Sequence, residues 1–127
     1  MVNNYDDTIF SLATAAGRSA TAMVRISGPR VNDVPKLLGF ARPEPKIASV
    51  RILKYQRKKL DQSIVLFFKG PESYTGEDMV EIHVHGGKAV ILAVQEEISK
   101  IKSCRLAEPG EFTKIAFQNE KINLLKA

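Results

Sequence analysis

The sequence predicts an α+β fold in which helices pack on a mostly antiparallel sheet. The order of elements is the first observation: strand-like and helix-like stretches follow one another as β-β-α-β-β-β-α-β-α, without the regular alternation of a parallel α/β sheet. Composition is the second observation. Of the 127 residues, 44% are hydrophobic and 26% are charged, which is typical of one folded domain with its own core.

The first half of the chain contains four predicted strands and one short helix. The strands are expected at residues 8–14, 20–27, 48–56 and 60–69, and the helix at residues 31–38, ending at Gly39. Alternation in the second strand places Arg25 on the face opposite Val24 and Ile26. The run Ile64–Phe68 is apolar at every position, so its strand is expected to be central and covered on both faces.

The second half contains two predicted strands and two helices. They are a strand over 79–85, a helix that follows Gly86 and Gly87, a short strand over 104–107, and a helix that starts at Pro109 and stops at Asn119. In the strand over 79–85, Glu81 and His83 share the face opposite Ile82. A new helical pattern starts at Lys121 and reaches Ala127 without a capping signal, so the chain is expected to be part of a longer protein.

Membrane and targeting signals are absent from the sequence. No apolar run approaches the ~20 residues that a membrane helix needs, and the polar, acidic N-terminus lacks the order of a signal peptide. A cytoplasmic location without membrane contact is therefore expected. The single cysteine, Cys104, excludes an internal disulfide and is interpreted as a half-buried structural thiol.

Motif chemistry by itself leaves alternatives open. Arg25 and Glu81 lie mid-strand on polar faces, so they either form an ion pair or line a pocket for a polar ligand. His83 and His85 have a spacing that can chelate a metal, but the chain has no third ligand at a recognised spacing. The pair Gly86 and Gly87 either offers backbone N–H groups to an anion or forms a tight turn.

Positive charge is concentrated in one predicted hairpin. The net charge is +5, and the densest basic cluster consists of Arg51, Lys54, Arg57, Lys58 and Lys59. This cluster is either a solvated hairpin or a contact for a polyanion such as RNA.

Four segments carry a family resemblance. They are residues 7–9 (DTI) with 16–18 (AGR); residues 24–29 (VRISGP); residues 70–78 (GPESYTGED) with Glu81 and 85–87 (HGG); and residues 109–112 (PGEF) with 116–117 (AF), Asn119 and Lys121. In this order and spacing they resemble the N-terminal domain of the MnmE (TrmE) family of tRNA-modifying GTPases.

The resemblance implies a fold, a ligand and three ligand contacts. The fold is similar to the tetrahydrofolate-binding domain of the glycine-cleavage T-protein, and the ligand is a 5-formyl-tetrahydrofolate type of cofactor. The family's folate contacts fall on Arg25, Glu81 and Lys121, with no catalytic residue and no metal site in this chain. A pterin edge carries N–H donors that suit a carboxylate, and a folate tail carries carboxylates that suit Arg or Lys.

The resemblance also implies domains and partners. Residues 1–119 are expected to form a folate-binding and homodimerisation domain, and residues 120–127 the start of a helical domain. The GTPase domain, with its GTP, Mg and K, is expected to be missing, so the fragment alone is expected to be inactive. The full-length family member works with the FAD-binding partner MnmG (GidA) to build an aminomethyl-type group on the tRNA wobble uridine. The alternative is a fragment that only dimerises and binds no ligand.

Overall fold

A computed structural model of the chain describes residues 7–14 and 21–126, except for the side chains of residues 14, 121–123 and 126. The predicted loop at 15–19, with the AGR segment of the resemblance, lies outside the described residues.

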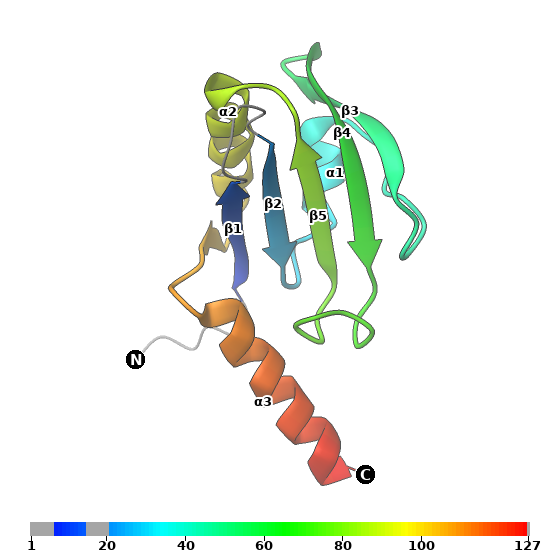
Figure 1. Cartoon of the computed structure of the whole chain (residues 1–127), viewed down its shortest axis with the longest axis vertical. Helices are drawn as coiled ribbons and strands as arrows, with labels where there is room; N and C mark the ends of the chain where they lie inside the picture. Colours follow the sequence, from blue (N-terminus) through cyan, green and yellow to red (C-terminus); the bar gives the residue numbers. More distant parts are fainter. Residues whose placement is uncertain (1–6, 15–20, 127) are drawn as a thin grey trace.

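Six strands form one sheet in the order β3-β4-β5-β2-β1-β6. Their bounds are β1 Thr8–Thr14, β2 Ala22–Ser27, β3 Ser49–Tyr55, β4 Lys58–Phe68, β5 Met79–Val84 and β6 Cys104–Leu106. Neighbouring strands are antiparallel except β1 and β6, which are parallel. The predicted α+β class with a mostly antiparallel sheet is therefore confirmed (Figure 1).

Two helices, α1 (Asp33–Leu38) and α2 (Lys88–Ser99), cover one face of this sheet (Figure 1). The predicted apolar alternation forms the sheet side of the core, with Val24, Ile26, Val80 and Ile82 fully buried. The helices contribute Val34 and Leu38 from α1 and Ile91, Val94 and Ile98 from α2. Burial of each such side chain contributes roughly 1.5–3 kcal/mol relative to exposure, so this layer holds the domain together.

The opposite face of the sheet, which we call the open face, has neither α1 nor α2 on it. Ile64 of β4 is 39% exposed there, and its cross-strand partner Val50 of β3 is 57% exposed. The prediction that Ile64–Phe68 is covered on both faces is therefore wrong. Apolar residues on both faces of a strand show that the strand tolerates burial on both. Whether each face is covered depends on how many helices the domain has to pack on the sheet.

The third helix, α3 (Glu111–Lys126), leaves from one end of the sheet and carries the C-terminus away from it (Figure 1). The predicted start at Pro109 is wrong because Gly110 has a φ of 75°, which a right-handed helix does not pass through. The predicted stop at Asn119 is also wrong, since α3 continues to Lys126. The proposed domain boundary after residue 119 stays a prediction, and it falls within this helix.

The β3–β4 hairpin is tighter than predicted. Gln56 and Arg57 have φ values of 50° and 67°, so they form a two-residue turn whose twist suits a hairpin. Lys58 and Lys59 consequently belong to β4 and not to the turn.

Candidate functional site

Arg25 and Glu81 lie directly opposite each other on β2 and β5, on the open face. Arg25 Nε donates to Glu81 Oε2 at 3.0 Å, and the two side chains are 30% and 15% exposed. The structure thus brings together two of the three residues that the resemblance implies as ligand contacts. It also realises the ion pair that was the alternative interpretation of these residues.

The ion pair uses only part of the hydrogen-bonding capacity of the two groups. Among the described residues, no side chain or backbone group accepts from the terminal nitrogens of Arg25, and none donates to Glu81 Oε1. His83 Nε2 lies 3.9 Å from that oxygen, beyond hydrogen-bond distance. Arg25 and Glu81 can therefore hold each other and still bind a polar ligand from the open face.

The loop of residues 69–78 packs at the end of β2 and supports this site. Ser27 is fully buried, and its hydroxyl donates to Glu77 Oε1 at 2.9 Å. Thr75, also buried, lies 2.8 Å from the Ser27 hydroxyl, and the backbone N–H of Glu77 donates to Thr75 Oγ1. Burial raises the pKa of Glu77 and outweighs the opposing effect of Ser27. These bonds hold the loop against the sheet.

Tyr74 projects from this loop toward Arg25. The Arg25 Cζ atom lies 5.7 Å from the centre of the Tyr74 ring, which is a cation–π distance. The Tyr74 hydroxyl lies 3.0 Å from Thr113 Oγ1 on α3. Neither Tyr74 nor Thr113 was predicted as a site residue, although Tyr74 is the single aromatic in the segment GPESYTGED.

Helix α3 is attached to the loop and the sheet edge close to this site. Asn119 Nδ2 donates to the carbonyl of Thr75 at 2.5 Å. Lys121, the third residue implied by the resemblance, lies on the same helix two residues later, and its side chain is outside the described atoms. Its role as a ligand contact stays a prediction.

Arg105 on β6 forms a latch between α3 and the strands. Its guanidinium donates to both carboxylate oxygens of Glu111, at 2.8 and 2.6 Å, and to Asp7 Oδ2 at 2.9 Å. The same Glu111 accepts from the backbone N–H of Glu108, and Arg105 holds the pKa of Glu111 below its usual range. No sequence motif pointed to this latch. The local signal for part of it is Glu111, which stands at the start of a helix three residues after Glu108. At that spacing a glutamate side chain commonly accepts from the backbone N–H three residues earlier.

The turn between β5 and α2 is held by a carboxylate. Asp61 of β4 accepts from the backbone N–H groups of His85, at 3.0 Å, and Gly86, at 2.9 Å. A Cβ atom on Gly86 would lie 2.7 Å from the Val90 side chain, so the turn requires glycine there. The tight-turn interpretation is therefore favoured over an anion site, because a carboxylate already takes the N–H group of Gly86.

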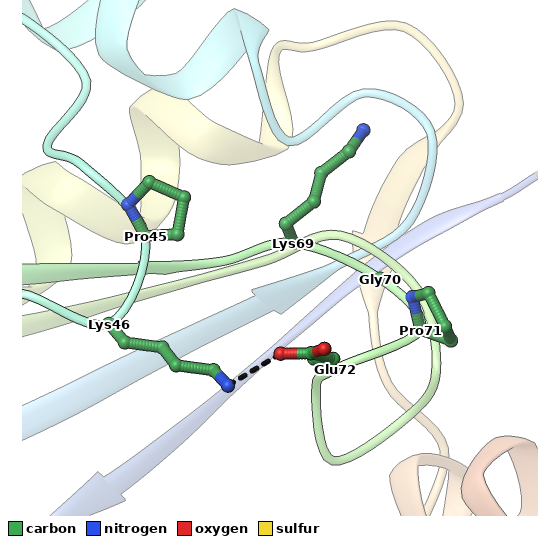
Figure 2. A pocket seen from close by; sticks show the side chains of 6 residues that line it. All are labelled: Pro45, Lys46, Lys69, Gly70, Pro71 and Glu72. Atoms are coloured by element: carbon green, nitrogen blue, oxygen red, sulfur yellow. Dashed lines mark hydrogen bonds and ion pairs between the residues drawn. The ribbon is translucent and has the colours of Figure 1, made fainter.

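A separate hollow of about 310 Å³ lies beside the end of β4 (Figure 2). It is lined by Pro45, Lys46, Lys69, Gly70, Pro71 and Glu72. Lys46 pairs with Glu72 at 2.7 Å, and Lys69 points away from that pair toward solvent, with Asp78 Oδ2 at 3.4 Å (Figure 2). Arg25 and Glu81 do not line this hollow, so it is distinct from the candidate site.

Metal and membrane features can be judged for the described part of the chain. There, no three His, Cys, Asp or Glu side chains gather closely enough to hold a metal ion. None of the described helices is long and apolar enough to cross a membrane. Cys104 is half-buried, as was expected, and burial raises the pKa of its thiol to about 11.

Comparison with known proteins identifies relatives over nearly the whole chain. The family model described as the GTP-binding protein TrmE N-terminus matches residues 8–121. The tRNA modification GTPase MnmE of Pelagibacter ubique is 58% identical over 123 residues, which are 94% of this chain and 28% of that protein. The protein of the same name from Caulobacter vibrioides is 54% identical over 121 residues, covering 95% of this chain and 27% of its own length.

A more distant relative gives the same picture. The tRNA modification GTPase MnmE of Anaplasma phagocytophilum is 46% identical over 129 residues, covering 100% of this chain and 28% of that protein. The chain therefore spans a little more than a quarter of the length of the curated relatives it matches.

Proposed function

The chain belongs to the family of TrmE N-terminal domains, and from this premise we propose that it is the folate-binding and dimerisation domain of a tRNA modification GTPase. The ligand would be a reduced folate of the 5-formyl-tetrahydrofolate type. The single observation that supports it best is the Arg25–Glu81 pair, which leaves donors and an acceptor unused on the open face.

Each end of a reduced folate has a chemical match in the three candidate residues. The amino-pyrimidinone edge of the pterin presents N–H donors and a carbonyl, which suit the free oxygen of Glu81 and a terminal nitrogen of Arg25. The glutamate tail presents carboxylates, which suit the ammonium group of Lys121. In this proposal the chain binds and orients the ligand and supplies no catalytic group of its own.

The remaining functions belong to the part of such proteins that this chain does not cover. We place GTP hydrolysis, with its Mg and K ions, in that part. We also place there the contacts with tRNA and with an FAD-binding partner of the MnmG (GidA) type. In this proposal the protein acts in the cytoplasm, and the fragment alone has no GTPase activity.

Isothermal titration with 5-formyl-tetrahydrofolate tests the folate proposal. We expect Glu81→Ala to weaken binding at least tenfold, because it removes the acceptor for the pterin edge. His83→Ala is the matched control on the same strand and face, and we expect a change of about twofold or less. Absence of heat at high micromolar ligand would refute folate binding, and equal losses in the two variants would refute the residue assignment.

An assembly module without ligand binding is a second candidate, supported by the apolar residues of the open face. Val50, Ile52 and Ile64 are 57%, 45% and 39% exposed and lie side by side on β3 and β4. Such a patch is suited to burial against a second copy of the chain. Sedimentation velocity should show a dimer that Ile52→Lys dissociates, whereas Leu92→Lys, on the exposed side of α2, leaves it intact. A dimer indifferent to folate would favour this candidate.

Contact with RNA through the basic hairpin is a third candidate, supported by an unfavourable arrangement of charges. Lys54 and Lys59 are exposed and directly opposite each other, and like charges in that position destabilise a hairpin. A phosphate backbone would relieve this repulsion. We expect the double substitution of Lys58 and Lys59 by Gln to reduce the slope of log affinity for tRNA against log salt by about 2. An unchanged slope would dispose of this candidate.

A further inference from the structure

Tyr74 is an exposed aromatic residue that the structure holds in a fixed position. Tyr74 is 54% exposed. The loop around it is nevertheless bonded on both sides: the Ser73 hydroxyl donates to the carbonyl of Glu77, and Thr75 is buried against Ser27 and Asn119. The Tyr74 hydroxyl is bonded to Thr113 on α3.

This arrangement presents a ring that is ordered before any ligand arrives. An exposed aromatic on a free loop would lose conformational freedom on binding, and that loss weakens affinity. Here the backbone is fixed by its neighbours and the hydroxyl by Thr113, so little freedom remains to be lost. Preorganised tyrosines of this kind offer a large flat contact area at low entropic cost.

The ring also lies beside the unused polar groups of the candidate site. Arg25 contacts Glu81 through Nε and the Tyr74 ring through its guanidinium, so a single residue joins the ring to the carboxylate. At 5.7 Å the cation–π contact is near the outer limit of about 6 Å, and Tyr74 is still 54% exposed beside it.

We propose that Tyr74 forms an aromatic subsite that stacks against a planar nitrogen heterocycle, while Arg25 and Glu81 hold the polar edge of that heterocycle. This inference rests on the proposed function, and it names the part of the folate that this site takes. The subsite selects the pterin ring and not the glutamate tail. Tyr74 thereby becomes a specificity-determining residue that the three implied contacts do not include.

Two variants separate stacking from a merely structural tether. Tyr74→Leu removes the ring, and we expect a loss of about threefold to tenfold in affinity for 5-formyl-tetrahydrofolate, the range of one aromatic contact. Tyr74→Phe keeps the ring and loses the bond to Thr113, so it should bind within about twofold of the wild type. If Tyr74 acts only by tethering α3, Tyr74→Phe and Thr113→Val will lose as much affinity as Tyr74→Leu.

Ligand fragments locate the contact. We expect 5-formyl-tetrahydropterin, which lacks the tail, to be weakened by Tyr74→Leu by the same factor as the whole folate. We expect p-aminobenzoylglutamate, which lacks the pterin, to bind wild type and Tyr74→Leu equally. The reverse dependence, with the tail fragment alone sensitive to Tyr74→Leu, would overturn the subsite.

A second measurement covers the case in which Tyr74→Leu does not fold. In the wild-type chain the ring protons of Tyr74, assigned by comparison with Tyr74→Phe, should shift on addition of 5-formyl-tetrahydropterin, because a stacked ring changes their shielding. Unmoved ring protons at saturating ligand overturn the proposal. If the wild type binds no folate at all, the proposed function itself fails; if it binds and Tyr74→Leu binds equally, only the aromatic subsite fails.

Discussion

Two arginine–glutamate pairs in this domain have similar exposure and different chemistry. The arginine side chain is 30% exposed in both Arg25–Glu81 and Arg105–Glu111. Arg105 uses Nε and both terminal nitrogens, donating to Asp7 and to both oxygens of Glu111. Arg25 uses Nε alone among the described residues, and it meets one oxygen of Glu81.

The difference separates a structural pair from a pair suited to a ligand. All three nitrogens of Arg105 are engaged with carboxylates, so this latch is suited to holding α3 to β6 and to Asp7, the residue before β1. The Arg25–Glu81 pair spans two neighbouring strands that the sheet already fixes, so its contribution to stability is expected to be small. Its unused atoms face the open side of the sheet, where a ligand has access.

The largest effect is expected from breaking the latch. Removing one partner of a fully buried pair costs about 3–5 kcal/mol, and because Arg105 is 30% exposed we expect Arg105→Ala to lower the free energy of unfolding by about 2 kcal/mol. Arg25→Ala is the matched control, for which we expect a loss below about 1 kcal/mol. Urea denaturation measures both. Equal losses would remove the distinction between the two pairs.

The second-largest effect is expected at the Arg25–Glu81 pair. Glu81→Gln keeps the shape of the side chain and removes its charge, so we expect about a tenfold loss of folate affinity, equivalent to about 1.4 kcal/mol. The free energy of unfolding should change by less than about 0.5 kcal/mol, because the pair is partly exposed and the strands are held by their ladders. Titration calorimetry measures the loss of folate affinity, and urea denaturation of the same variant measures the change in the free energy of unfolding. A larger change in unfolding than in binding would make Glu81 a structural residue.

The sequence predicts the sheet far better than it predicts α3 or the latch. Strand alternation is local, so Val24, Ile26 and Ile82 were placed correctly on the buried face. The start of α3 depends on the positive φ of Gly110, which no local pattern indicates. Proline is favourable as the first residue of a helix, so the sequence predicted a start at Pro109 instead. The Arg105–Asp7 contact joins residues 98 positions apart, and no local pattern contains that distance.

The candidate site divides in the same way. The pairing of Arg25 with Glu81 could be anticipated, because both alternate with apolar residues in strands of one sheet. Tyr74 could not, because its position depends on how the loop of residues 69–78 folds against Ser27 and α3. Loop geometry follows from tertiary contacts and not from periodicity, so Tyr74 was recognised as a site residue only in the structure.

The contribution of the latch to stability is expected to depend on pH. Arg105 lowers the pKa of Glu111 below the unfolded value of 4.5, so the carboxylate stabilises the fold above that pH. Stability from this group is lost as pH falls from about 4.5 through the lowered pKa, and we expect a decrease of about 1 kcal/mol over that window. Glu111→Gln should flatten this part of the profile of unfolding free energy against pH. An unchanged acid slope in Glu111→Gln would show that the latch does not contribute to it.

The smallest effect concerns Glu77, whose shift has the opposite sign. Burial raises its pKa above 4.5, so the folded state binds a proton more tightly than the unfolded state, and stability falls as pH rises from 4.5 through the raised value. Glu77→Gln removes the charge and keeps an oxygen that accepts from the Ser27 hydroxyl. We therefore expect the variant to be more stable than the wild type by about 0.5 kcal/mol at pH 7, with the difference vanishing below pH 4.5. A variant less stable at pH 7 would mean that the loop beside the candidate site uses the negative charge of Glu77. Glu77 would then resemble the latch, whose charges stabilise the fold, more than the Arg25–Glu81 pair, whose unused atoms are available to a ligand.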